Sequence, residues 1–152
     1  MSVKVARERA QDLWGEILPL LQEHFLEISA YPDIALDPDI DAYNEVEDKG
    51  CLRCYTARLN GELIGYAVFF VRHNLHYRQS LQAVQDVLFV SKPHRSGRVG
   101  YKLIRYSEDQ LRAEAVQVVY HHVKVNTPQT VELFHKLAYE SIDLIVGKRL
   151  DR

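Results

Sequence analysis

The residues best suited to chemistry form a basic, glycine-containing turn between Ser91 and Ile104. Gly97 and Gly100 flank the entry to an expected helix, so unhindered backbone N–H groups and the positive helix end face one point. Five cations fall within the fourteen residues 92–105: Lys92, Arg95, Arg98, Lys102 and Arg105. The arrangement suits a phosphate or pyrophosphate, and an ordinary turn with solvated charges is the alternative. The turn is not a P-loop, because GxxxxGK(S/T) is absent, and the absence of GxGxxG argues against a nicotinamide cofactor.

The cysteines and the adjacent histidines offer little to a metal. Cys51 and Cys54 form one CxxC without a second pair, which is a weak zinc signal. Alternation along a strand would place the two thiols on opposite faces, so we expect buried structural thiols in a reducing cytosol and no metal. His121 and His122 are consecutive on an expected strand, and the same alternation argues against a joint metal site.

Hydrophobic periodicity predicts the elements that must position the turn. A series of apolar residues over 10–28 predicts an amphipathic helix, which Pro19 is expected to bend or divide near Leu18. Tyr31–Asp39 has the composition of a loop, and its last residue is expected to cap a short second helix that ends near Asp48.

The rest of the chain first alternates strands with turns and then strands with helices. Asn60-Gly61 is a strong hairpin signal between two strands. The expected strands cover residues 3–6, 51–59, 62–71, 81–90, 116–124 and 141–150, and the further helices cover 99–113 and 128–138. We therefore expect an α/β (α+β) fold with a mixed, mostly antiparallel sheet, helices on both faces and one parallel strand–helix–strand crossover. Ligands of such sheets gather beyond the carboxyl ends of the strands, where the basic turn lies.

Composition limits the class of protein. The 152 residues, 47% hydrophobic and 26% charged, suit one globular domain over residues 1–152. A net charge of only −2 argues against a nucleic-acid or membrane partner. No apolar stretch approaches the ~20 residues of a membrane span and the N-terminus lacks a signal-like core, so we expect a cytoplasmic protein. The charge is uneven, −6 over residues 1–76 and +4 over residues 77–152.

The order of the elements and the sequence around the turn resemble the GNAT family, the Gcn5-related N-acetyltransferases. Arg95-Ser96-Gly97-Arg98-Val99-Gly100 is similar to the family signature Q/R-x-x-G-x-G/A, which follows the fourth strand. The further matches are Leu88-Phe89-Val90, Pro93, Leu103-Ile104, Asn126 and the ending Leu133-Phe134-His135-Lys136-Leu137-Ala138-Tyr139. The resemblance covers nearly the whole chain, looks most like small bacterial and phage members, and implies an acyl-CoA N-acyltransferase-like fold.

The resemblance implies that acetyl-CoA is the acyl donor and lies between the strands at 81–90 and 116–124. Its pantetheine arm would pair with the backbone around Leu88, Phe89 and Val90, and Asn126 and Phe134 would complete the cofactor site. Its pyrophosphate would meet the signature itself: Arg95, Ser96, Gly97, Arg98, Val99, Gly100 and Tyr101. An amine would attack the thioester carbonyl directly, with the N–H of Val90 as the oxyanion donor.

Asp86 is the residue expected to act as the base. An amine with a pKa of about 10.4 is an ammonium at neutral pH and must lose a proton before it attacks. Regular alternation would place Asp86, four residues before Val90, on the same strand face as Val84, Leu88 and Val90. Polyamine-type members of the family carry a glutamate there, and the shorter aspartate implies relay through a water. A strand-end Asp paired with an arginine is the alternative.

Departures from the family pattern bear on activity. Arg98 occupies the first glycine position and Gly97 lies one residue early, so shifted amides would rebuild the cradle. Phe134 stands where many members carry the tyrosine proposed as general acid, but a thiol with a pKa of about 8.5 can leave without one. These departures keep open a catalytically silent CoA-binding module with an interaction or regulatory role. The shortened C-terminus leaves a sheet edge where a homodimer could form by strand exchange.

The acceptor is expected to be a primary amine of a small molecule or protein, and an acidic segment would favour a cationic one. Seven acids and no Lys or Arg lie over residues 33–48: Asp33, Asp37, Asp39, Asp41, Glu45, Glu47 and Asp48. Helix capping and solubility are the alternative explanation. His24 with Glu27, and His76 with Tyr77, would border the acceptor pocket, while solvated or hydrogen-bonded structural roles are their alternatives.

Overall fold

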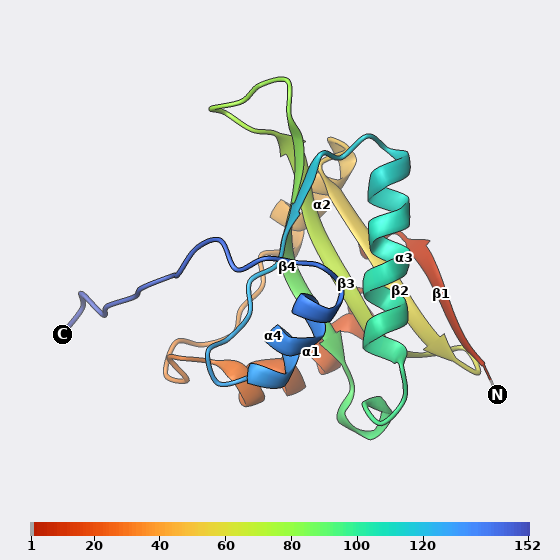
Figure 1. The fold of residues 1–152 in the computed structure, drawn as a ribbon. Coiled ribbons are helices and arrows are strands. Elements are labelled where there is room, and N and C mark those ends of the chain that lie inside the picture. Colours follow the sequence, from red (N-terminus) through yellow and green to blue (C-terminus); the bar gives the residue numbers. More distant parts are fainter. Residues whose placement is uncertain (1) are drawn as a thin grey trace. The chain divides into compact units, whose positions relative to one another are not determined.

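A five-stranded sheet is the frame on which the site is built (Figure 1). This computed structural model describes residues 2–152. These residues form two compact units, one that ends at His122 and one that covers Val123–Arg152. The strands are β1 (Val3–Glu8), β2 (Leu52–Leu59), β3 (Glu62–His73), β4 (Leu81–Val90) and β5 (Val118–Tyr120). They lie in that order, with antiparallel pairs from β1 to β4 and a parallel β4–β5 pair. The predicted mixed sheet is confirmed.

The β2–β3 hairpin turns where the sequence predicts, at Asn60-Gly61. Both residues have positive φ, 51° and 83°, which a two-residue hairpin turn requires and which Asn and Gly adopt most easily. Further along β3, a Cβ added at Gly65 would lie 2.9 Å from the carbonyl oxygen of Phe89 on β4. This close approach of two backbones requires glycine and pins β3 to β4 next to the site.

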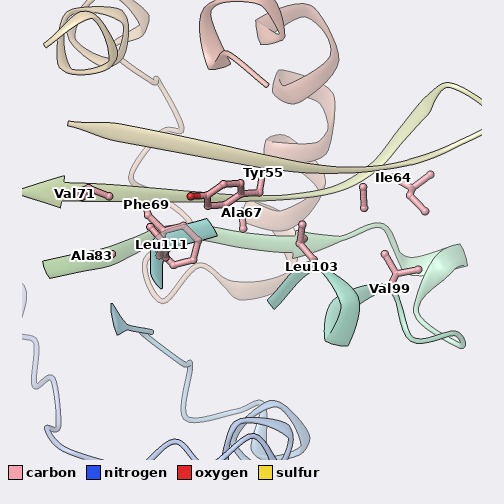
Figure 2. Packing of buried hydrophobic residues seen from close by; sticks show 10 residues of the cluster. Tyr55, Ile64, Ala67, Phe69, Val71, Ala83, Val99, Leu103 and Leu111 are labelled. Atoms are coloured by element: carbon pink, nitrogen blue, oxygen red, sulfur yellow. The ribbon is translucent and has the colours of Figure 1, made fainter. Parts of the chain in front are cut away.

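Helices cover both faces of the sheet, as predicted. On one face α3 (Val99–Ala113) contributes Val99, Leu103 and Leu111 to a cluster that includes Tyr55 and Phe69 of the strands (Figure 2). The 3-10 helix η1 (Ala10–Asp12) and α1 (Trp14–Ile28) cover the other face. The cluster there contains Ala10, Leu13, Ile17, Tyr66, Val68 and Phe89. Over residues 2–152, none of the helices has the length and apolar character to cross a bilayer.

α1 runs unbroken through Pro19, so of the two expected effects, a bend or a division near Leu18, the division does not occur. Proline lacks the N–H that would bond the carbonyl of Gly15 one turn earlier, which costs the helix a single hydrogen bond. Gly15 has open space around the position of a Cβ, so the turn beneath the proline ring is uncrowded. Burial of Ile17 against the sheet then keeps the helix whole.

Part of the acidic segment serves helix ends. Asp39 accepts the backbone N–H of Ala42 at 3.0 Å and caps α2 (Ile40–Asp48), which confirms the predicted cap. Glu47 accepts the backbone N–H groups of Ala10 and Gln11 at 2.8 and 3.0 Å, at the start of η1. For these carboxylates the structure supports the capping explanation rather than a role in binding a cationic acceptor.

The C-terminal elements are shorter than predicted. β5 covers three residues rather than 116–124, and α4 (Pro128–Lys136) begins at the predicted proline. The predicted strand over 141–150 is wrong, because these residues form no regular element. A strand needs both a hydrogen-bonded neighbour and a surface for its apolar side chains, and an apolar run supplies neither by itself. The large apolar side chains of residues 141–150 are exposed: Ile142, Leu144, Ile145, Val146 and Leu150.

Candidate functional site

The N-terminus of α3, at the glycine-containing turn, has the geometry of an anion cradle. No described side chain caps this helix end. The first hydrogen bond in the helix joins the Lys102 N–H to the Arg98 carbonyl at 2.9 Å. The N–H groups of Val99, Gly100 and Tyr101 therefore precede the helical ladder and point out of the helix end. Together with the helix dipole they favour a phosphate.

Both glycines of the turn leave the backbone open to a ligand. A Cβ added at Gly97 would meet no atom within 4 Å, and one at Gly100 would meet only a methyl group of Val90, at 3.9 Å. Neither glycine has the positive φ that would require this residue type. Internal packing and backbone conformation therefore do not explain the two glycines, whereas close approach of a ligand to the backbone does.

Arg95 is held by contacts within the chain. It follows the 3-10 helix η2 (Lys92–His94), and its Nη1 and Nη2 each lie 2.8 Å from a carboxylate oxygen of Glu27 on α1. Its Nε donates to the Val90 carbonyl at 2.7 Å. The Arg98 guanidinium lies 4.3 Å from the centre of the Tyr101 ring. Arg95 therefore positions the turn, and the backbone N–H groups are better placed to meet phosphate.

Among residues 2–152, no strand pairs with the outer edge of β4 beyond β5, where the cofactor arm is expected. The Ser91 N–H donates to the Ile64 carbonyl at 2.8 Å, so these two residues face each other as a hydrogen-bonded antiparallel pair. Since such pairs alternate with non-bonded ones, the backbone groups of Leu88 and Val90 face away from β3. β5 pairs only with Gln82–Val84 of β4. An extended pantetheine arm could therefore pair with β4 beyond the end of β5.

Asp86 lies at a β-bulge, which changes the face on which its side chain lies. The register pairs Gln85 and Val87 with consecutive residues of β3, so Asp86 is unpaired in this ladder. Leu88 and Val90 pack against the cluster on the α3 side, whereas Asp86 and Val87 both line a pocket with residues of α1. The expectation that Asp86 shares a face with Leu88 and Val90 is therefore wrong, because one extra residue reverses the alternation.

Asp86 has the environment of a base. Tyr43 of α2 donates its hydroxyl to Oδ2 of Asp86 at 2.6 Å, so the partner is a tyrosine rather than an arginine. Burial raises the pKa of Asp86, and the hydrogen bond from Tyr43 opposes part of that rise. Burial and the neighbouring carboxylate also raise the pKa of Tyr43, which keeps its hydroxyl protonated. A carboxylate with a raised pKa is a stronger proton acceptor, as a general base requires.

The pocket at Asp86 is small and mainly apolar. Its cavity volume is about 20 Å³, which admits about one water-sized group. Its walls include Trp14, Ile17, Tyr43, Tyr66 and Val87, and Asp86 is the one charged residue among them. Trp14, Tyr43 and Tyr66 were not among the expected site residues. They come from α1, α2 and β3, and packing of these elements brings them to Asp86.

The four residues expected to border the acceptor pocket, His24, Glu27, His76 and Tyr77, do not line the pocket at Asp86. Glu27 pairs with Arg95 instead, and the His24 ring packs on an aromatic ring of β4 with centroids 4.8 Å apart. The backbone N–H groups of the other two donate to one asparagine side chain in the β3–β4 loop, at 2.8 and 3.2 Å.

Two expected cofactor residues, Asn126 and Phe134, lie in the unit Val123–Arg152. Phe134 meets Tyr139 edge to face, with ring centroids 5.0 Å apart, and the roles of both expected residues at the cofactor stay predictions.

Cys54 is buried, and burial raises the pKa of its thiol to about 12. Cys51 is only partly buried, so the expectation of two buried thiols is wrong for this one, which precedes β2.

Comparison with protein families gives the class of protein that this fold and site define. The model of the Acetyltransferase (GNAT) family matches residues 14–139. The chain therefore belongs to the GNAT family of acetyltransferases, as the sequence around the turn predicts. None of the curated proteins searched matches the chain.

Solved structures share the fold at low sequence identity. The chain is similar to a ribosomal-protein-alanine N-acetyltransferase from Brucella melitensis biovar Abortus 2308, at 16% identity and TM-score 0.74 over 98% of this chain and 99% of that one. It is also similar to the aminoglycoside acetyltransferase HMB0005 from an uncultured soil metagenomic sample, at 17% identity and TM-score 0.77 over 99% of each chain. Glucosamine-6-phosphate N-acetyltransferase from Arabidopsis thaliana is 13% identical, with TM-score 0.73 over 99% of this chain and 100% of that one. These likenesses confirm the fold.

Proposed function

We propose that this protein is an acetyl-CoA-dependent N-acetyltransferase that acetylates a primary amine of a small molecule, with Asp86 as the base. One observation carries the proposal: the β4 bulge places a desolvated carboxylate in a pocket, on the strand whose open edge suits the pantetheine arm. Family members similar in fold include acetyltransferases of aminoglycosides and of glucosamine-6-phosphate, which supports a small-molecule amine as the acceptor.

The residues of the cradle and of β4 fit the donor. The backbone N–H groups of Val99, Gly100 and Tyr101 would bind the pyrophosphate, and the outward backbone groups of Leu88 would hold the pantetheine arm. When bound, acetyl-CoA supplies an acetyl thioester that a neutral amine can attack. Because Arg95 already occupies the Val90 carbonyl, the Val90 N–H is the group that would stabilise negative charge on the attacked oxygen.

Proton transfers at the acceptor fall to Asp86, and departure of the thiol needs little help. Tyr43 orients the carboxylate through its hydrogen bond and stays protonated itself. A CoA thiol has an ordinary pKa of about 8.5, so it can leave largely as thiolate. The phenylalanine at position 134, where many family members carry a tyrosine, is therefore compatible with turnover.

The test is incubation of the pure protein with acetyl-CoA and a panel of amines, with detection of the free thiol. We expect thiol release with at least one amine, and a melting temperature that rises with acetyl-CoA or CoA. Absence of turnover despite a CoA-induced rise in melting temperature would instead favour a silent CoA-binding module. Arg98, which occupies a glycine position of the family signature, is the observation that suggests this second function. Absence of any thermal shift would contradict both functions.

A further inference from the structure

The walls of the pocket at Asp86 suit a small cation. Asp86 supplies a single negative charge in surroundings that remove much of its water. Trp14, Tyr43 and Tyr66 add three aromatic side chains, whose ring faces attract cations. The Trp14 indole N–H is already donated to Asn44 at 2.9 Å, so its polar atom is satisfied outside the pocket. What this tryptophan offers a ligand is its ring.

The Tyr66 hydroxyl is a second, independent indication of a ligand. Tyr66 is 1% exposed and lines the pocket, and its hydroxyl has no hydrogen-bond partner among residues 2–152. Buried hydroxyl groups almost always have a partner, because burial without one is unfavourable. A ligand group that bears N–H donors would satisfy the Tyr66 oxygen and the Asp86 carboxylate together.

Resting on the proposed function, we propose that this pocket binds the protonated amino group of the acceptor, and that the acceptor is an unhindered primary amine with one positive charge and an apolar body. An –NH3⁺ group is about the size of a water, which matches the cavity volume of about 20 Å³. An N-methyl group exceeds that room. The second charge of a polycation would lie against apolar walls without a partner, since Asp86 is the one charged lining residue.

Binding in this pocket also positions the proton transfer. One N–H bond of the ammonium breaks and an O–H bond forms on Asp86, which leaves a neutral amine and a carboxylic acid. The neutral amine is no longer attracted by the carboxylate or by the rings, so it can move to the thioester at the open edge of β4. Direct contact with Asp86 then replaces the water relay that the short aspartate side chain implies.

The single tryptophan of the chain, Trp14, reports on the pocket without acetyl-CoA. We would titrate the protein with n-pentylamine, N-methylpentylamine and the polycation kanamycin, and follow the fluorescence of Trp14. We expect a saturable change with n-pentylamine and binding at least about tenfold weaker for the N-methyl compound, since one misplaced methyl group changes affinity by that order. Kanamycin should leave the fluorescence unchanged.

Two tyrosine variants make a matched pair for the control. Tyr66→Phe and Tyr55→Phe each remove a buried hydroxyl without a described partner, but Tyr55 packs in the cluster on the α3 side. Tyr66→Phe should weaken n-pentylamine binding about tenfold, as loss of a hydrogen bond to a charged group does, while Tyr55→Phe should not. Equal effects of the two variants, or equal affinity for both pentylamines, would overturn the inference. Amine binding without acetyl transfer would refute the proposed function alone, and transfer to kanamycin without a Trp14 response would refute this inference alone.

Discussion

Glu27 and Arg95 form a two-point ion pair that ties α1 to the turn carrying the anion cradle. Both nitrogen–oxygen distances are 2.8 Å, and the pair lowers the pKa of Glu27, which keeps it charged at neutral pH. The same guanidinium donates to the Val90 carbonyl and lies 5.4 Å from the centre of the Phe89 ring. Arg95 therefore joins α1, the end of β4 and the cradle, although the family signature suggests direct contact with the cofactor.

The first prediction separates positioning by Arg95 from direct phosphate binding. Arg95→Ala and Glu27→Gln should each raise the KM for acetyl-CoA about three- to tenfold, because loss of either partner loosens the cradle. Initial rates of thiol release give both values. The double variant should be no worse than Arg95→Ala alone, because Arg95→Ala already removes the ion pair with Glu27. If Arg95 binds phosphate directly, Glu27→Gln should leave KM unchanged or lower it.

Removal of the Asp86 charge should abolish most turnover and spare cofactor binding. Asp86→Asn keeps the size of the side chain and an oxygen for the Tyr43 hydroxyl, but it cannot take a proton from the acceptor. We expect kcat to fall about 10²- to 10⁴-fold, the usual contribution of a positioned base. The rise in melting temperature with CoA should remain as in the parent protein. A variant with nearly unchanged kcat would contradict the assignment of the base.

The same substitution should raise stability at neutral pH. A carboxyl whose pKa is raised on folding favours the folded state below its ordinary pKa of 3.8, and this contribution is lost as pH rises through the folded value. At pH 7 the buried Asp86 charge therefore opposes folding, and Asp86→Asn removes that charge. Melting temperatures should differ most at neutral pH and converge toward pH 3. Asp109→Asn, at an exposed carboxylate, serves as the control and should lack this pH dependence.

Local signals predict most of the fold, and long-range packing decides much of the site. Asn60-Gly61 and Asp39 act on the backbone within a few residues of their own positions, so their sequence positions are sufficient to predict the turn and the cap. The bulge at Asp86 is a property of the β3–β4 pairing, and strict alternation therefore predicts the wrong face.

Contacts between distant segments account for the other differences. Trp14, Tyr43 and Tyr66 reach Asp86 only through packing of two helices and a neighbouring strand, which no local pattern encodes. The apolar run over 141–150 has the residue types of a strand, but it lacks the hydrogen-bonded neighbour that a strand requires. Glu27 has the helical position expected of a pocket residue, but it forms an ion pair with Arg95 instead.

Tyr43→Phe should move the pH dependence of catalysis. The Tyr43 hydroxyl stabilises the charged form of Asp86, so its removal should raise the pKa of Asp86 further. Because the base must be ionised, the acidic limb of kcat/KM against pH should shift to higher pH. The loss of rate should be several-fold near the acidic limb and small well above it. A uniform loss at all pH values would indicate that Tyr43 acts on the acceptor instead.

Gly100→Ala should separate stability from cofactor binding. Gly100 is the second residue of α3, and an alanine Cβ there would lie 3.9 Å from a Val90 methyl group, which is ordinary contact. Alanine favours the helix over glycine by about 0.5–1 kcal/mol, so the melting temperature should rise slightly. The new methyl group would lie over the N–H groups offered to the pyrophosphate, and we expect CoA affinity to fall about tenfold or more by calorimetry.

Gly15→Ala, at the second residue of α1 and equally open, is the matched control. It should give the same gain in stability with unchanged CoA affinity, and equal CoA affinity in the two variants would argue that phosphate binds elsewhere than at the start of α3.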